Sequence, residues 1–162
     1  RRNKSAPGSN GVNYLIYKKC PSLSRHLHKL ICRIWRTGVV PPQWKVGVST
    51  LIPKTDDLKD PGKFRNITLQ NCSGKLFFAI WGDRALEHMT RNLFIDTSVQ
   101  KGFMKKTPGC LEHTQALLEE IKDAKSHRRQ VHVIWIDLMN AYGRVPHSLI
   151  IYALRRYHLP KF

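Results

Sequence analysis

Acidic residues are scarce in this sequence of 162 residues. It contains 11 Asp and Glu against 28 Lys and Arg, which gives a formal net charge of +17 and a pI near 10.2. Such an imbalance predicts a polyanionic partner, because each phosphate neutralised by Lys or Arg releases a condensed counterion. Nucleic acid is the first expectation, and an anionic membrane surface is the alternative.

Long hydrophobic runs are also lacking. No stretch approaches the roughly 18 apolar residues that a membrane-spanning helix needs. The opening residues 1–8 lead directly into turn-forming residues and show no signal-peptide pattern. We therefore expect no membrane partner. Hydrophobic residues still make up 41% of the chain, which is enough for one folded domain with a core. We therefore expect a folded chain and not a disordered one.

Paired cysteine motifs are absent. The four cysteines, Cys20, Cys32, Cys72 and Cys110, are scattered without a Cys-x-x-Cys pair. This spacing predicts reduced thiols, as in nuclear or cytoplasmic proteins, and not a disulfide framework. His28 with Cys32, and Cys110 with His113, lack the second pair of ligands that structural zinc requires, so no zinc site is expected. The sequence has no internal repeat or low-complexity tract.

What the sequence does contain is a series of periodic segments. Alternating residues from Trp44 to Ile52 predict a strand, and residues 64–69 predict a second strand, so the two form a hairpin around the loop 55–62. Helices are predicted from Leu23 to a stop at Gly38, from an N-cap at Ser73 toward Leu93, over 111–124, and from Leu149 to Pro160. The first helix has a basic face comprising Arg25, His26, His28, Lys29, Arg33 and Arg36. Such faces are most often simply solvated, so this one favours phosphate contact only modestly.

The segment Val131–Leu138 is short, apolar and rich in β-branched residues. This pattern predicts a strand that is buried on both faces. Asp137 stands at its C-terminal end, and carboxylates are seldom buried without a partner, so we expect it to face a cation or a basic side chain in a cleft. The alternative is that Asp137 caps the turn that follows, since strands often end in Asp or Asn.

Residues 137–142, Asp-Leu-Met-Asn-Ala-Tyr, resemble the first catalytic motif of reverse transcriptases. Their continuation over 143–150 is similar to the version found in non-LTR (LINE-type) retrotransposons. Four earlier blocks occur in the order typical of that family: residues 4–12 resemble "APGxDG", 51–54 "LIPK", 64–69 "YRPISL" and 100–110 "QxGFxxgrs". The chain departs from the pattern at Asn10, where Asp is common, and at Asn66, where Pro is common.

The resemblance implies a role for individual residues. Asp137 would bind two Mg²⁺ ions, which align the primer and the incoming nucleotide. Lys54, Arg65, Leu138 and Tyr142 would contact the nucleotide, with the Tyr142 ring placed beneath the sugar where it excludes a ribose 2′-hydroxyl. The template side of the site would comprise Gln100, Gly102, Phe103, Lys105 and Lys106. A local alternative is that Lys54 or Arg65 only neutralises Asp56, Asp57 or Asp60, although such exposed pairs contribute about 0 to 1 kcal/mol.

The fold implied is α+β, a partial right-hand polymerase with a fingers hairpin and helices over residues 1–109 and the opening strand and helix of the palm over 110–162. Its partners would be an RNA template, a DNA primer, a dNTP and the remainder of a polymerase chain. The family's Tyr-x-Asp-Asp motif does not follow Asp137, which is the last acidic residue. We therefore expect the chain to be catalytically incomplete alone. The alternative is a non-catalytic, basic nucleic-acid-binding module derived from a retroelement.

Overall fold

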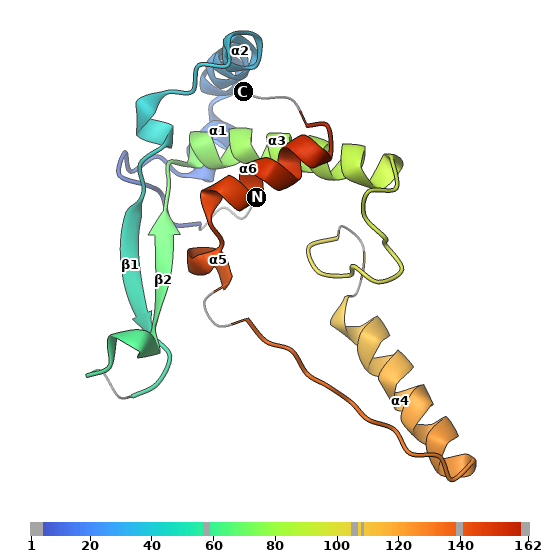
Figure 1. Cartoon of the computed structure of the whole chain (residues 1–162). Coiled ribbons are helices and arrows are strands. Elements are labelled where there is room, and N and C mark those ends of the chain that lie inside the picture. The colour runs from blue at the N-terminus through green and yellow to red at the C-terminus, as the bar shows by residue number, and fades with distance from the viewer. Residues whose placement is uncertain (1–4, 57–58, 105–106, 108, 139–140, 160–162) are drawn as a thin grey trace. The chain divides into compact units, whose positions relative to one another are not determined.

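The computed structural model of the chain describes residues 5–56, 59–104, 107, 109–138 and 141–159, and leaves out the side chains of residues 141 and 142. It divides into two compact units, of which the first covers Arg1–Arg84 and the second Ala85–Lys161. Helices and one small sheet make up the described residues, which confirms a mixed α+β composition (Figure 1).

Two consecutive helices follow the entry loop of the first unit. Helix α1 covers Tyr14–Lys19, and the Asn13 side chain caps it by accepting hydrogen bonds from the backbone N–H groups of Leu15 at 3.0 Å and Ile16 at 3.3 Å. Helix α2, Pro21–Thr37, begins with a proline, whose missing N–H costs nothing in the first turn. It ends at Gly38, which has a positive φ of 70° and confirms the predicted stop.

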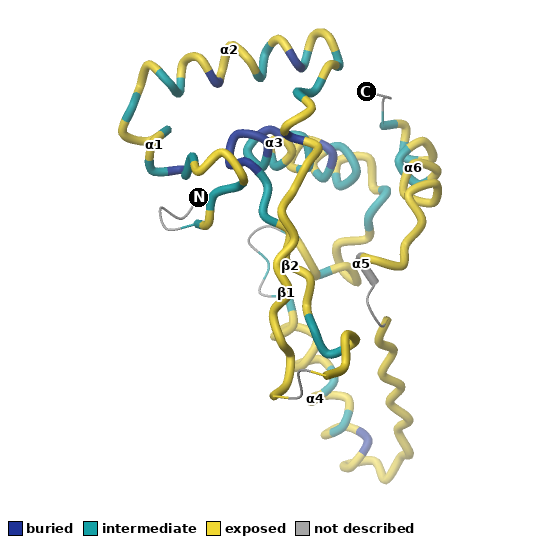
Figure 2. The backbone as a smooth tube through the Cα atoms, turned by 90° about the vertical axis from the view of Figure 1, so that its left-hand side faces the viewer, coloured by how far each residue is buried: buried dark blue, intermediate teal, exposed yellow. Residues whose placement is uncertain are grey.

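The core of the first unit forms where α2 meets the start of a long helix, α3 (Cys72–Arg91). Leu27 and Ile34 of α2 contact a cluster that includes Trp44 and Phe77, whose ring centroids are 5.8 Å apart. Trp35 meets Phe77 edge to face at 6.2 Å. Figure 2 shows the buried residues concentrated at the start of α3.

Trp44 lies in a different element from the one predicted. It ends the short 3-10 helix η1 (Pro42–Trp44) and is only 5% exposed, whereas the strand begins later, at Val48. The physical reason is that Pro41 and Pro42 cannot donate ladder hydrogen bonds, while the indole contributes most by filling the core. The alternating pattern therefore overestimates the strand by four residues at its start.

The predicted hairpin is confirmed. Strand β1 (Val48–Pro53) pairs antiparallel with β2 (Phe64–Leu69), in a register that runs from Val48 opposite Leu69 to Pro53 opposite Phe64. The connection contains a second 3-10 helix, η2 (Pro61–Lys63), in which the Asp60 carboxylate accepts a hydrogen bond from the Gly62 N–H at 2.8 Å. Every residue of β1 is exposed, so its alternation does not produce a buried face.

Asn71 connects three segments of the first unit. Its backbone carbonyl accepts the bond from the Lys75 N–H at 2.9 Å, which opens α3, so the prediction that Ser73 caps this helix is wrong. Its side chain donates to the carbonyl of Gln43 at 3.1 Å and accepts from the N–H of Asn10 at 3.3 Å. With an exposure of only 5%, Asn71 is satisfied by partners that are far away in the sequence. Short-range patterns give no sign of this.

In the second unit, Phe94 joins the end of α3 to the end of α6 (His147–Arg156). Its ring centroid lies 5.9 Å from that of His88 and 5.5 Å from that of Tyr157. The His88 Nε2 atom lies 3.1 Å from the Tyr157 carbonyl oxygen. Helix α4 (Cys110–Ser126) has Ala124 as its buried residue, and the short helix α5 covers Ala141–Arg144.

Residues Val131–Leu138 are not a strand, contrary to the prediction. They run between α4 and α5 without regular secondary structure (Figure 1), and Ile134, Trp135 and Ile136 are 82%, 80% and 86% exposed. A strand needs a neighbour that accepts and donates its backbone hydrogen bonds. Within the described ranges, the sheet consists of β1 and β2 alone, and neither pairs with this segment. The prediction of burial on both faces fails for the same reason.

Candidate nucleotide and nucleic-acid site

Two predicted nucleotide contacts, Lys54 and Arg65, lie at the turn end of the hairpin. Arg65 stands opposite Ile52, and a hydrogen bond from the Lys54 N–H to the Lys63 carbonyl, at 2.7 Å, continues the register by one residue. Lys54 and Arg65 are therefore diagonal neighbours on one face, a relationship that corresponds to roughly 7 to 8 Å. Both are exposed.

Local neutralisation does not explain these cations within the described residues. The Lys54 ammonium donates to the Gly62 carbonyl at 3.4 Å, and neither Lys54 nor Arg65 forms an ion pair with Asp56 or Asp60. Asp57 lies outside the described residues. The hairpin thus presents two basic side chains whose positive charge can act on an outside anion.

Lys63 is a basic residue beside these two that the sequence prediction did not include. It ends η2, its carbonyl accepts the hydrogen bond from the Lys54 N–H at 2.7 Å, and it lies two residues before Arg65. The two-residue spacing between Lys63 and Arg65 was the available signal. It becomes informative only once the strand and its register are known.

Asp137 lies near the end of the unpaired segment in the second unit and is exposed. Across the described part of the chain, no three His, Cys, Asp or Glu residues come together in a group that could hold a metal ion. Two-metal phosphoryl transfer needs enough carboxylates to hold ions about 3.5 to 4 Å apart. The residues present do not fit a pair of Mg²⁺ ions by themselves.

Leu138 and Tyr142 follow Asp137 along the chain. Leu138 is 72% exposed at the end of the extended segment. Tyr142 belongs to α5, but its side chain lies outside the described residues, so its predicted place beneath a sugar remains a prediction. Asp137, Leu138 and Tyr142 belong to the second unit, whereas Lys54 and Arg65 belong to the first.

The predicted template loop is irregular over residues 100–104. The Gln100 side chain donates to the Gly102 carbonyl at 2.9 Å, which closes a small turn. Phe103 is 88% exposed and has a positive φ of 60°, an uncommon conformation for a bulky residue. Lys101 forms an ion pair with Glu112 at 2.7 Å, whereas Lys105 and Lys106 lie outside the described residues.

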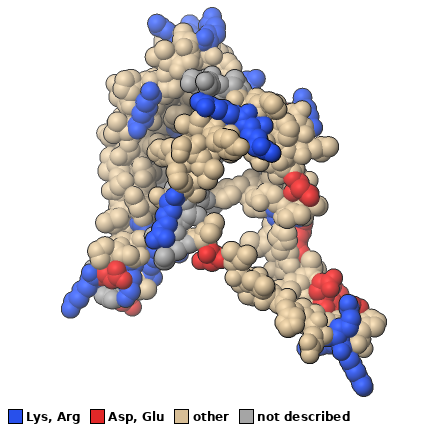
Figure 3. All heavy atoms as spheres, viewed as in Figure 1, with Lys and Arg blue, Asp and Glu red and all other residues tan. Residues whose placement is uncertain are grey.

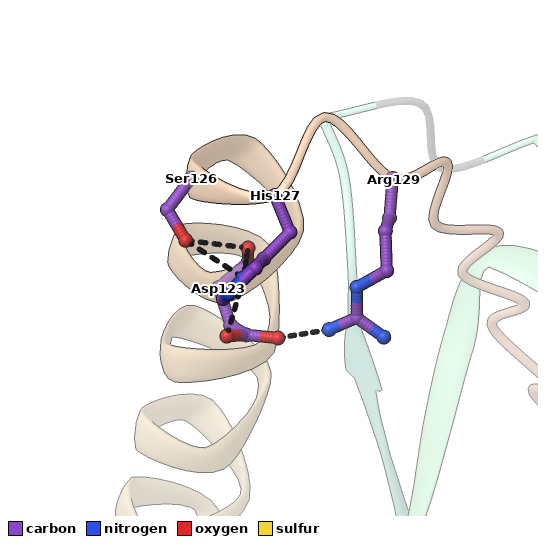
Figure 4. A network of polar contacts seen from close by, with 4 residues as sticks. All are labelled: Asp123, Ser126, His127 and Arg129. Carbon is purple, nitrogen blue, oxygen red and sulfur yellow. Dashed lines mark hydrogen bonds and ion pairs between the residues drawn. The ribbon is translucent and has the colours of Figure 1, made fainter.

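The basic turn before the Asp137 segment is partly neutralised. In Figure 4, Asp123 of α4 contacts the His127 ring, with Oδ1 at 3.0 Å from Nδ1, and also forms an ion pair with Arg129. The Ser126 hydroxyl donates to the Asp123 carbonyl at 2.8 Å. These groups are about half exposed or more, so the network contributes little to stability but holds the chain as it leaves α4.

Comparison with known proteins identifies several relatives among curated sequences. A retrovirus-related Pol polyprotein from a type-1 R2 retrotransposable element of Popillia japonica is 30% identical over 154 residues, which are 94% of this chain and 20% of the relative. Its counterpart in Nasonia vitripennis is 27% identical over 97% of this chain and 14% of the relative. A probable RNA-directed DNA polymerase from transposon BS of Drosophila melanogaster is 24% identical over 94% of this chain and 17% of the relative.

No family model and no solved structure matches the chain. The chain spans a fifth or less of the length of these curated relatives. Their similarity nevertheless covers almost all of its residues and agrees with the family suggested by the short motifs. The chain is therefore a homologue of the Pol proteins of non-LTR retrotransposons.

Proposed function

We propose that the chain forms part of an RNA-directed DNA polymerase and contributes to binding the RNA template, the DNA primer and the incoming dNTP. The observation that carries the proposal is the similarity to retrotransposon polymerase proteins over 94 to 97% of the chain. The exposed cations of the hairpin support it, since Lys54 and Arg65 share a face and are suited to a triphosphate. A nuclear or cytoplasmic location is part of the proposal, because the four cysteines are free thiols.

We propose that Asp137 is a catalytic carboxylate whose partner carboxylates are not among the residues described. Residues 1–109 would then belong to the fingers of a right-hand polymerase and 110–162 to the opening of its palm. Leu138 and Tyr142 would line the nucleotide, and Gln100, Gly102, Phe103, Lys105 and Lys106 would contact the template. In such an assembly the exposed segment Val131–Leu138 would gain a neighbouring strand, which would bury its apolar side chains.

The second candidate function is nucleic-acid binding without catalysis. It is favoured by the absence, over the described residues, of a carboxylate cluster near Asp137. The charge of +17 would serve either function equally. Primer extension separates the two, because it requires the catalytic carboxylate whereas binding does not.

The test of the proposed function is Asp137→Asn in a longer polymerase that contains this chain. Loss of a carboxylate that stabilises the transition state removes several kcal/mol, so we expect primer extension to fall roughly a thousandfold or more. Binding of template and primer should stay within about twofold, since phosphate contacts do not involve Asp137. Extension rates and filter binding measure the two effects.

Arg65→Ala in the same protein is the comparison. It should weaken use of the nucleotide by about one to two decades in kcat/KM, because a hydrogen bond to a charged group contributes about 1.5 to 3 kcal/mol. Normal extension by Asp137→Asn would overturn the catalytic assignment and return Asp137 to a turn-capping role. A protein that binds nucleic acid but does not extend a primer, whether residue 137 is Asp or Asn, would establish the second candidate.

A further inference from the structure

Four basic residues form one continuous line along α2. Arg25, Lys29, Arg33 and Arg36 are spaced by four, four and three positions, and all four are exposed. At about 100° per residue these spacings place them within about 80° of one another around the helix, over about 16 Å of its length. We name these four residues the basic ridge.

The basic ridge is not balanced by acids. Helix α2 contains no acidic residue, and Asp56 is the first acidic residue of the whole chain. Over the described ranges, no carboxylate forms an ion pair with any residue of the ridge. Like charges four residues apart on a helix destabilise it by roughly 0.2 to 0.5 kcal/mol per pair. An unfavourable line of charge without a carboxylate partner among the described residues favours an anionic partner outside the chain.

Packing of α2 directs the ridge to solvent. The opposite side of the helix carries Leu27, which is 8% exposed, and Ile34, which is 1% exposed, and both lie in the core of the first unit. Trp35 contacts Phe77 edge to face, and the guanidinium of Arg84 lies 4.5 Å from the centroid of its ring. The helix therefore cannot rotate without breaking this core. Figure 3 shows Lys and Arg side chains projecting over α2.

A partner that matches the ridge must carry several negative charges along its length. The two candidates are a nucleic-acid backbone and an anionic lipid surface. Helices that bind at lipid surfaces insert an apolar face among the acyl chains. The apolar face of α2 is instead occupied by Trp44 and Phe77. A strand of phosphates needs only the charged face, and it matches a ridge about three turns long.

We propose that the basic ridge of α2 binds the phosphodiester backbone of a nucleic-acid strand, without preference for base sequence. The proposal rests on the proposed function for the class of ligand, but it adds a surface outside the nucleotide and template residues already assigned. Because the contacts are ionic, the ridge should contribute affinity that falls steeply with salt.

The test replaces all four ridge residues by Gln in the full chain, since Gln keeps helix propensity while removing charge. The matched control replaces Lys125, Arg128, Arg155 and Arg156, which are exposed basic residues of the second unit. Binding to single-stranded RNA, single-stranded DNA and an RNA–DNA hybrid is measured by fluorescence anisotropy from 50 to 200 mM salt. Vesicles with anionic lipid serve as the membrane arm.

If four phosphates contact the ridge, its removal should lower the slope of log affinity against log salt by about 3 on a single strand. The original chain should then lose about 50-fold more affinity than the ridge variant across this range of salt. The control should change the slope by less than 1. If the slope decreased equally in the ridge and control variants, the attraction would be diffuse, and the ridge would be overturned as a site.

A second measurement avoids the variants altogether. Lys29 of the original chain should be protected from an amine-reactive reagent by bound oligonucleotide, whereas Lys125 should not. Strong nucleic-acid binding without protection of Lys29 would overturn the ridge but leave the proposed function standing. Absence of any nucleic-acid binding, or binding to vesicles alone, would overturn both.

Discussion

At the scale of single residues, two glycines of the same helix should respond oppositely to one substitution. Gly74 and Gly82 both lie in α3. A Cβ on Gly74 would come 2.9 Å from Cγ of Trp44, in the core of the first unit, whereas a Cβ on Gly82 would meet nothing within 4 Å. Alanine normally stabilises a helix interior by up to about 1 kcal/mol relative to glycine.

We therefore expect Gly82→Ala to stabilise the chain by about 0.5 to 1 kcal/mol and Gly74→Ala to destabilise it by about 1 to 3 kcal/mol, since Trp44 must move from a packed site. Denaturant unfolding of both variants, with Trp fluorescence as the probe, measures the difference. A stabilising effect of Gly74→Ala would mean that Trp44 does not pack against α3 as described.

Asp96 should contribute stability that depends on pH. The Ser98 hydroxyl, at 2.5 Å, is the main cause that lowers the pKa of the Asp96 carboxyl, and the Ser98 N–H at 2.9 Å adds to it. These bonds favour the ionised form. Their stabilisation is therefore present above the ordinary pKa of the carboxyl, about 3.9, and is lost as the pH falls through the lower folded value.

Ser98→Ala should raise the pKa of Asp96 toward its ordinary value, and Thr97→Ala should not. A carbon-detected NMR titration of the Asp96 carboxyl measures this directly. Near neutral pH the Ser98→Ala variant should therefore be less stable than the original chain. In strong acid this difference in the free energy of unfolding should disappear. The same pKa in all three proteins would rule out the hydrogen bond as its cause.

At the scale of elements, those with their own boundary signals matched their predictions closely. Helix α2 starts at Pro21, two residues before the predicted Leu23, and stops at the predicted Gly38, whose positive φ acts within one turn of the chain. The hairpin strand β2 also has the predicted bounds, 64–69. By contrast, the start of α3 depends on Asn71, whose side-chain partners Gln43 and Asn10 are 28 and 61 positions away.

The Val131–Leu138 segment shows the opposite case. Its β-branched residues favour extended backbone, and the segment is extended between α4 and α5, but a strand also requires a partner strand. Propensity is a property of the residues, whereas pairing is a property of the neighbours. Whether this segment becomes a strand depends on a neighbouring strand, not on its own composition.

At the scale of the whole molecule, charge is distributed unevenly between the units. The first unit carries 16 Lys and Arg against 4 Asp and Glu, and the second carries 12 against 7. Acidic side chains gather over α4 (Figure 3), where Glu119 and Asp123 already pair with neighbouring cations. The first unit is therefore the stronger attractor of phosphates, in agreement with the positions of the hairpin cations and the basic ridge.

Exposed apolar surface should limit the solubility of the chain alone. Ile134, Trp135 and Ile136 are consecutive and each at least 80% exposed, and such apolar β-prone segments favour association between chains. Replacing Ile134 and Ile136 by Lys should raise the soluble concentration severalfold. The control variant replaces Val39 and Val46, which are exposed in the first unit, by Lys. It adds the same charge and should raise the soluble concentration less.

Trp135 provides the direct check on this exposure. Its fluorescence, obtained by difference from Trp135→Phe, should be quenched by acrylamide nearly as strongly as free tryptophan. A protected Trp135 in a soluble monomer would mean that the segment finds an apolar partner within the chain. No helix in the described ranges combines the length and the apolar character needed to span a bilayer.

The amino-acid sequence by itself determined the charge, the two-strand hairpin, most helix bounds and the relationship to retrotransposon polymerases. These depend on local chemistry: periodicity, proline and glycine at helix ends, and short motifs in a set order. The tertiary structure alone decided that Trp44 lies in the core and not in the predicted strand, that Asn71 opens α3, that Lys54 and Arg65 share a face, and that Val131–Leu138 is unpaired. Each of these depends on contacts between residues distant in the sequence, which no local pattern encodes.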